Sequence, residues 1–384
     1  MGLFHKKQES YIGVDIGARG IKLVELRRTK SRPQLWTYGI AEENLDIHPT
    51  ASDKPIEELL REPLPGSSLH HKPGDSGVPK LGPQENEFDE AKIDRYAFLL
   101  KELLKTARVR GRQAASSLPV SHVFHTIINL PKVPDKEIDG LVAAEVAKVL
   151  SEPIDTVQIV HQQVPLAENL SKQYIRLLVT AAPKQMVRFY SGIFQKAGLQ
   201  LFELETEAFA LARSLIGKDE TLTMTVDIGA DRTNFALIDK GLPMTQRSLH
   251  LGGQILDRLI ADRLGVTVQE AAHIKHDVAT VSEKSLIFDP FIRFLEPIAK
   301  EIQYHFDLYL SQSGNEGRRP EKIILTGGAA LFPPIAGYLK QQFPVRVFIG
   351  DPWARVIYQE GLKPILHDIA PRMAVSIGLA LRHF

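Results

Sequence analysis

Val14-Asp15-Ile16-Gly17-Ala18 recurs unchanged as Val226-Asp227-Ile228-Gly229-Ala230, with 212 residues between the two aspartates. Each copy is flanked by short apolar segments that have the composition and alternation of β-strands. These segments are residues 11–14 and 21–26 around the first copy, and residues 223–226 and 235–238 around the second. In a Rossmann fold the glycine-rich turn must open a helix, so the strand context excludes that fold. The repeat therefore predicts two similar strand–turn–strand hairpins, one in each half of the chain.

An Asp-x-Gly turn inside a hairpin suits the binding of a phosphate. Glycine has no Cβ, so backbone N–H groups can come close to phosphate oxygens, and Asp15 and Asp227 can hold Mg²⁺ through bound water. One such hairpin alone is more often an ordinary turn. The second copy, together with the Gly327-Gly328 turn after a buried strand at 322–325, favours a site in which two hairpins clamp one nucleotide.

The composition excludes several other functions. Forty-seven Lys and Arg against 46 Asp and Glu leave a net charge of +1, which gives no electrostatic reason to bind nucleic acid or an anionic membrane. The chain has no cysteine, which excludes disulfides, thiolate metal sites and cysteine nucleophiles. The P-loop, G-x-S-x-G and H-E-x-x-H motifs are absent. We expect neither a secretory signal nor a membrane helix; a weak membrane contact through Leu3-Phe4 stays open.

Regular structure is expected along most of the chain except one segment. Seven prolines and four glycines between Pro49 and Pro83 predict a loop or disordered insertion there. Apolar residues at helical spacing predict helices, the last of which would carry Pro371 in its first turn. The expected helices include residues 89–107, 253–264, 267–276, 290–312 and 371–382.

These features together resemble the actin-like ATPase superfamily. The order matches a phosphate-1 hairpin (Asp15, Gly17), a phosphate-2 hairpin (Asp227, Gly229, Thr233) and an adenosine turn over residues 326–330. Within that superfamily the chain is similar to the PilM family of type IV pilus assembly proteins, which are relatives of FtsA. Further stretches carry this resemblance, namely residues 21–26, 118–119, 129–131, 179–184, 197–199, 207–213 and 378–382.

The resemblance implies an α/β protein with an actin-like ATPase fold. Two mixed-sheet domains would surround a nucleotide cleft, and an FtsA-type subdomain would be inserted into the first domain. The implied division is a first domain of residues 11–118, 172–219 and 366–384 with the insertion at 49–83, a subdomain of residues 119–171, and a second domain of residues 220–365.

ATP and Mg²⁺ are the cofactors that the resemblance implies. Asp15 and Asp227 would organise the metal, and Glu207 would orient the attacking water as general base; a plain helix N-terminal carboxylate is the other interpretation of Glu207. Lys22 stays open between a phosphate ligand and a solvated strand residue. The implied nucleotide contacts are Asp15, Gly17, Ala18, Lys22, Asp227, Gly229, Ala230, Thr233, Gly252, Gly253, Glu270, Lys275, Gly327, Gly328 and Ala329.

The chain departs from the family pattern at three places. Ala18-Arg19-Gly20 stands where relatives carry hydroxyl residues, so backbone N–H groups or Arg19 would have to replace those donors. Asp257 takes the place of a threonine, and Ala272 that of an acidic residue. We therefore expect nucleotide binding without efficient hydrolysis.

The resemblance also implies partners and a location. The family binds the cytoplasmic N-terminal tail of PilN in a groove between the first domain and the inserted subdomain, at the inner face of the bacterial inner membrane. Other pilus inner-membrane proteins and assembly ATPases are further implied partners; membrane contact would be indirect, no nucleic acid is expected, and self-association stays open. The alternatives are a small-molecule kinase or phosphatase of the same superfamily, and an FtsA-like division protein.

Overall fold

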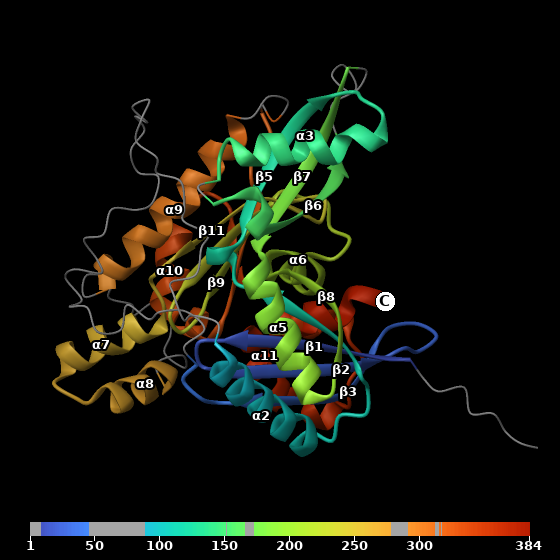
Figure 1. Cartoon of the computed structure of the whole chain (residues 1–384). Coiled ribbons are helices and arrows are strands. Elements are labelled where there is room, and N and C mark those ends of the chain that lie inside the picture. The colour runs from blue at the N-terminus through green and yellow to red at the C-terminus, as the bar shows by residue number, and fades with distance from the viewer. Residues whose placement is uncertain are drawn as a thin grey trace, which may run out of the picture.

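The computed structural model describes residues 9–45, 89–150, 152–165, 173–277, 291–311, 315 and 317–384. The insertion predicted at 49–83 lies outside the described residues. Within them the strands form two five-stranded sheets and one three-stranded sheet, with helices packed around and between them (Figure 1).

The two five-stranded sheets share one strand arrangement. In each, three antiparallel strands are followed on one side by two parallel strands. The first sheet has the order β3-β2-β1-β4-β8 and consists of β1 (Ser10–Gly17), β2 (Gly20–Arg27), β3 (Gln34–Ala41), β4 (Gln113–Leu118) and β8 (Gln200–Thr206). The second has the order β11-β10-β9-β12-β13 and consists of β9 (Thr223–Ile228), β10 (Thr233–Asp239), β11 (Leu242–Leu249), β12 (Lys322–Thr326) and β13 (Arg346–Ile349). The repeated motif therefore forms the β1–β2 and β9–β10 hairpins, which confirms the predicted strand–turn–strand context.

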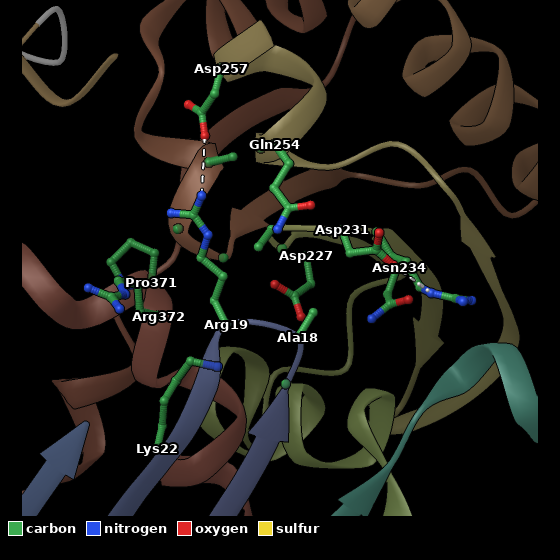
Figure 2. Close-up of a pocket in the computed structure, with 18 of the residues that line it drawn as sticks. Ala18, Arg19, Lys22, Asp227, Asp231, Asn234, Gln254, Asp257, Pro371 and Arg372 are labelled. Carbon is green, nitrogen blue, oxygen red and sulfur yellow. Dashed lines mark hydrogen bonds and ion pairs between the residues drawn. The ribbon is translucent and has the colours of Figure 1, made fainter. Parts of the chain in front are cut away.

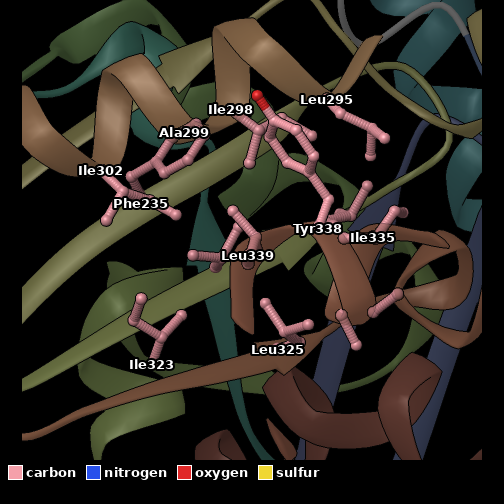
Figure 3. Packing of buried hydrophobic residues seen from close by; sticks show 14 of the residues in the cluster. Phe235, Leu295, Ile298, Ala299, Ile302, Ile323, Leu325, Ile335, Tyr338 and Leu339 are labelled. Carbon is pink, nitrogen blue, oxygen red and sulfur yellow. The ribbon is translucent and has the colours of Figure 1, made fainter. Parts of the chain in front are cut away.

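Helices bury both faces of each sheet. On the first sheet, alternate strand residues such as Ile12 and Val14 pack against α2 and α5, whereas Val24 and Leu26 pack against α11. Strand residues of the second sheet pack against α9 and α10 (Figure 3). The main helices are α2 (Glu90–Thr106), α5 (Lys184–Ala197), α6 (Glu207–Leu211), α7 (Gly253–Leu264), α8 (Val268–Asp277), α9 (Ile292–Leu310), α10 (Pro333–Gln342) and α11 (Lys363–Ala380).

Helix α11 connects the two halves of the molecule. It begins at Lys363, so the prediction that it starts with Pro371 in its first turn is wrong; Pro371 lies in the helix interior. The Pro371 carbonyl accepts from the backbone N–H of Gly327 and from the hydroxyl of Thr326, each at 3.0 Å. The helix that covers the first sheet is thus tied to the end of β12 in the second.

The three-stranded sheet belongs to the inserted region. It consists of β5 (Phe124–Pro131), β7 (Tyr174–Pro183) and β6 (Val157–Val164), in that spatial order, and α3 (Asp135–Ala147) covers one face. Strand β7 is central and pairs with both others. The sheet therefore extends beyond the subdomain boundary predicted at residue 171, because without β7 its other two strands would have no partner.

The chain also returns to the first sheet earlier than the predicted boundary at residue 365. The backbone N–H of Leu35 donates to the Ile357 carbonyl (2.8 Å) and that of Ile357 to the Pro33 carbonyl (2.9 Å). Trp353 is buried in the same cluster as Val24. Apart from these two boundaries, the division into domains stays a prediction. None of the helices in the described ranges is both long and apolar enough to cross a bilayer.

Candidate functional site

A cleft of about 510 Å³ lies between the two hairpins and is lined by both halves of the chain. Its volume is in the range of ligand pockets for small molecules and cofactors. Thirteen of the sixteen site residues predicted from the sequence line it. They are Asp15, Gly17, Ala18, Lys22, Glu207, Asp227, Gly229, Ala230, Gly253, Lys275, Gly327, Gly328 and Ala329.

Two predicted nucleotide contacts instead build the frame behind the cleft. Thr233 is fully buried, and its hydroxyl donates to the Leu251 carbonyl (2.5 Å). A Cβ on Gly252 would lie 2.5 Å from the carbonyl oxygen of Ala230, so glycine is required there for close packing of the β9–β10 turn against the start of α7. Neither residue lines the cleft.

Glu270, the third exception, is a helix-capping residue. Its carboxylate accepts from the backbone N–H (2.8 Å) and the hydroxyl (2.9 Å) of Thr267, while the backbone N–H of Glu270 donates back to that hydroxyl (3.2 Å). This reciprocal pattern is a capping box. Glu270 is exposed and stabilises the start of α8 instead of facing the cleft.

The two hairpins carry polar side chains at equivalent positions, but these side chains have different hydrogen-bond partners. Asp15 is paired across the strands with Lys22, and Asp227 with Asn234. Lys22 Nζ donates to Asp15 Oδ2 (2.7 Å), whereas Asn234 Nδ2 donates to Glu207 Oε2 (2.7 Å). Asp15 is therefore neutralised by its cross-strand partner, and Asp227 is not.

The carboxyl groups of the cleft perturb one another. Burial, and then the charge of Asp15, raises the pKa of Asp227 to about 7. Burial, and then the charges of Asp227 and Asp15, raises the pKa of Glu207 to about 8. Carboxylates that crowd together in this way fit a divalent cation, which would neutralise them.

The donor set suits Mg²⁺ bound together with a phosphate. Among the described residues, no group of three or more His, Cys, Asp or Glu is arranged to hold a metal. Mg²⁺ typically keeps several waters and is held by one or two carboxylates plus substrate phosphates. Asp15 and Asp227 on opposite hairpins would supply those carboxylates, so the residues present fit the group that the superfamily implies.

Glycines keep the walls of the cleft open for a ligand. A Cβ would lie 3.3 Å from Lys22 Nζ if placed on Gly17, and 3.1 Å from the Ala329 Cβ if placed on Gly253. On Gly229 it would lie 3.1 Å from a backbone oxygen of its own turn. Side chains at these positions would crowd the surfaces that a phosphate would approach.

Several polar residues that are not among the sixteen predicted site residues also line the cleft. Asn234 could have been predicted from the sequence, because the register of the hairpin pairs it with Asp227 across the strands. Arg372 comes from α11 and reaches the cleft only through tertiary packing. The additional polar lining residues include Arg19, Glu42, Asp231, Arg232, Asn234, Gln254, Asp257, Gln269, His273 and Arg372 (Figure 2).

A second cavity of about 330 Å³ lies beside the cleft, between the edge strands β8 of the first sheet and β6 of the inserted sheet. Two short segments run from one cavity to the other: Leu118 and Thr206 line this groove, and their chain neighbours Pro119 and Glu207 line the cleft. The groove is lined by Leu118, Gln158, Val160, Thr180, Ala182, Val187, Ser191, Leu201, Phe202, Glu203, Leu204, Glu205 and Thr206.

Two sheets of equal topology, each with an Asp-x-Gly hairpin at a shared cleft, define a protein of the actin-like ATPase fold. A solved structure titled "PilM-PilN type IV pilus biogenesis complex" has a TM-score of 0.73 to this chain and 24% sequence identity, covering 97% of this chain and 98% of the other. The ethanolamine utilization protein EutJ from Carboxydothermus hydrogenoformans matches at 16% identity and TM-score 0.49, covering 97% and 89%, and the MamK double helical filament at 13% and 0.48, covering 97% and 98%.

The sequence family described as "Type IV pilus assembly protein PilM" matches residues 84–384. The chain belongs to this family, and its role lies in type IV pilus assembly.

Proposed function

We propose that this chain is a scaffold of the pilus machinery that binds ATP with Mg²⁺ in the cleft and the cytoplasmic N-terminal tail of PilN in the groove. The observation that carries the proposal is that the two cavities lie at consecutive residues of the chain: Leu118 and Thr206 line the groove, and Pro119 and Glu207 line the cleft. Through PilN the chain would sit at the inner face of the inner membrane, among other inner-membrane pilus proteins and the assembly ATPases. Its near-neutral net charge agrees with attachment through a protein partner.

The cleft residues divide the work of holding the nucleotide. Asp15 and Asp227 would hold Mg²⁺ through bound water, and the metal when bound neutralises phosphate charge. The glycine-rich hairpin turns would present backbone N–H groups to the phosphates. The turn that begins at Gly327, whose φ of +85° only glycine adopts readily, would face the adenosine.

Glu207 is the candidate general base, and its surroundings favour slow hydrolysis. One of its oxygens already accepts a hydrogen bond from Asn234 Nδ2 (2.7 Å), which leaves fewer acceptor positions for an attacking water. We therefore propose that nucleotide occupancy, and not rapid turnover, is the functional state of the cleft.

The groove suits an extended apolar peptide. Strands β8 and β6 are both edge strands of the described sheets, and an edge strand can pair with an added strand. Val160 on β6 is 54% exposed and lies in this groove, opposite apolar residues of β8 that include Phe202 and Leu204. A peptide tail that becomes ordered on binding would cover these side chains.

A calorimetric titration tests the proposal. A synthetic PilN N-terminal tail is titrated into the full chain with and without Mg-ATP, and into the variant Val160→Glu. The matched control is Val149→Glu, a valine that is 43% exposed but outside the groove. We expect Val160→Glu to weaken tail binding at least about tenfold, because a charge would be buried against apolar side chains, and Val149→Glu to leave it unchanged.

Two results would count against this function. Equal tail affinity in the two valine variants would remove the groove from the proposal. Fast turnover on a sugar or other small phosphate acceptor, with no binding of the tail, would favour the kinase or phosphatase alternative.

A further inference from the structure

Among the described residues, every Lys and Arg side chain that lines the cleft is paired with a carboxylate. These pairs differ in the distance between nitrogen and oxygen. Four of these pairs are close, and the fifth, made by Arg19, is long. The pairs are Lys22 with Asp15 (2.7 Å), Lys275 with Asp257 (2.5 Å), Arg232 with Asp231 (3.2 Å), Arg372 with Glu42, and Arg19 with Asp257 (3.8 Å).

Arg19 is the cation that is most easily released. Its Nη2 lies 3.8 Å from Asp257 Oδ2, which is beyond hydrogen-bonding distance. Its side chain is 49% exposed, against 18% for Lys22 and 10% for Lys275. An ion pair of this length, with half of the Arg19 side chain in solvent, contributes little free energy, so a ligand could recruit Arg19 at low cost.

Asp257 is already bound to another cation. It lies on α7 with 1% exposure, and its Oδ1 accepts from Lys275 Nζ (2.5 Å). Its Oδ2 is buried and has no hydrogen-bond donor among the described residues. Lys275 therefore keeps most of the charge of Asp257 compensated if Arg19 leaves, and Arg19 is a second, shared partner.

The position of Arg19 places it in the path of a bound phosphate. It follows Ala18 directly in the turn of the first hairpin, whereas Asp257 belongs to the second half of the chain. Figure 2 shows the Arg19 side chain extended across the cleft towards Asp257, with Lys22 and Asp227 near its base. The ion pair thus spans the cleft from the first phosphate hairpin to α7.

We propose that Arg19 is a phosphate-binding residue of this chain, and that the polyphosphate of the nucleotide takes its guanidinium from Asp257. This proposal rests on the proposed nucleotide function. It adds the role of one residue, Arg19, and the change of its partner from Asp257 to phosphate. A guanidinium binds phosphate oxygens through two parallel hydrogen bonds, which its present geometry with Asp257 does not provide. Arg19 would supply the donors that Ala18 and Gly20 lack.

The exchange also has a structural consequence. Without nucleotide, Arg19 links the first hairpin to α7 across the cleft; with nucleotide, the same side chain would link the first hairpin to the phosphates. The contribution of Arg19 to binding should then depend on whether the Asp257 carboxylate competes for it.

The test compares affinities for ATP and for adenosine, because only ATP carries the phosphates. Both are measured with Mg²⁺ by competition against a fluorescent ATP analogue, using wild type, Arg19→Ala, Asp257→Asn and the double variant. Arg263→Ala serves as the control, since Arg263 is exposed on α7 and does not line the cleft. Circular dichroism and thermal midpoints confirm that each variant is folded.

We expect Arg19→Ala to weaken ATP binding about 10- to 100-fold, the range for hydrogen bonds to a charged group, with adenosine and the Arg263→Ala control unchanged. Asp257→Asn should tighten ATP binding about two- to fivefold by abolishing the competing ion pair, and that gain should shrink when Arg19 is absent.

Three outcomes would overturn the proposal in different ways. An unchanged ratio of ATP to adenosine affinity in Arg19→Ala, while wild type binds ATP, would refute the role of Arg19 and leave the nucleotide site intact. Strictly additive effects in the double variant would refute the exchange with Asp257. No binding of ATP by wild type would refute the nucleotide function and this role together.

Discussion

Replacing His125 by glutamine should make the protein more resistant to acid while leaving its stability at neutral pH nearly unchanged. His125 lies on β5, and its Nε2 donates to the Pro243 carbonyl on β11 (2.8 Å). This hydrogen bond joins the inserted sheet to the second half of the molecule. The amide nitrogen of glutamine can occupy the place of Nε2 and does not titrate, so the change removes the proton uptake and keeps the bond.

The size of the effect follows from the pKa of His125. Burial lowers that pKa to about 4, against an opposing hydrogen bond to Pro243, whereas an unfolded chain has about 6.5. Between these values the unfolded state binds more protons than the folded state, so stability falls as pH falls from about 6.5 to about 4. At about 1.36 kcal/mol per unit, His125 costs roughly 2 kcal/mol at pH 5 relative to pH 7.5.

The effect of a second buried histidine, His305, on acid stability must be distinguished from the effect of His125. Burial, and then the charge of Arg247, lowers the pKa of His305 to about 3, and its Nδ1 lies 2.5 Å from the Thr245 hydroxyl. His305 therefore adds an acid sensitivity of the same sign in wild type and in a His125 variant. The difference between the two proteins isolates the contribution of His125.

Urea denaturation at pH 7.5, 6.0 and 5.0 measures that difference. The free energy of unfolding of His125→Gln should equal that of wild type at pH 7.5 and exceed it by about 2 kcal/mol at pH 5.0. His125→Ala, which also loses the bond to Pro243, should be about 1 kcal/mol less stable at pH 7.5. If wild type and His125→Gln lose the same free energy between pH 7.5 and 5.0, the reasoning is refuted.

Three further substitutions test other parts of the structure. Asp227→Asn should weaken Mg-ATP binding at least about tenfold in calorimetry, because it removes a carboxylate from the Mg²⁺ site; unchanged affinity would exclude that role. Gly378→Ala should lower the free energy of unfolding by about 1–3 kcal/mol or more, since its Cβ would overlap the backbone of α6, whereas Gly140→Ala, with no atom within 4 Å, should be neutral or stabilising. Thr206→Val removes the bond to Gln246 (2.9 Å) between β8 and β11, and it should lower the free energy of unfolding in urea by roughly 1 kcal/mol; an unchanged free energy would show that this bond does not stabilise the contact between the two sheets.

The parts of the site that could be predicted are those encoded within a single hairpin or turn. The repeated Asp-x-Gly motif lies between strands of clear period-two pattern, so its local structure follows from nearby residues. The capping role of Glu270 can also be predicted locally, because Thr267 three residues earlier completes a capping-box signature. That signature favours the interpretation as a helix cap over a nucleotide contact.

The parts that could not be predicted depend on contacts between distant segments. A proline typically belongs to the first turn of a helix, yet Pro371 lies inside α11, where its carbonyl accepts from residues at the end of β12. Arg372, its neighbour, reaches the cleft for the same reason. Strand β7 is the centre of the inserted sheet only because β5 and β6 pair on both sides of it, and strand pairing of this kind is not a local property of the sequence.

The duplicated hairpins make one asymmetric site, and the asymmetry comes from a single register position. Where the first hairpin sets Lys22 opposite Asp15, the second sets Asn234 opposite Asp227. Lys22 neutralises Asp15, but Asn234 donates to Glu207, so Asp227 lacks a cation at the equivalent place and its pKa rises through burial and the charge of Asp15. The charge that would complete the site would therefore come with the ligand, and Mg²⁺ bound to a nucleotide would bring it to the half of the cleft that the protein leaves uncompensated.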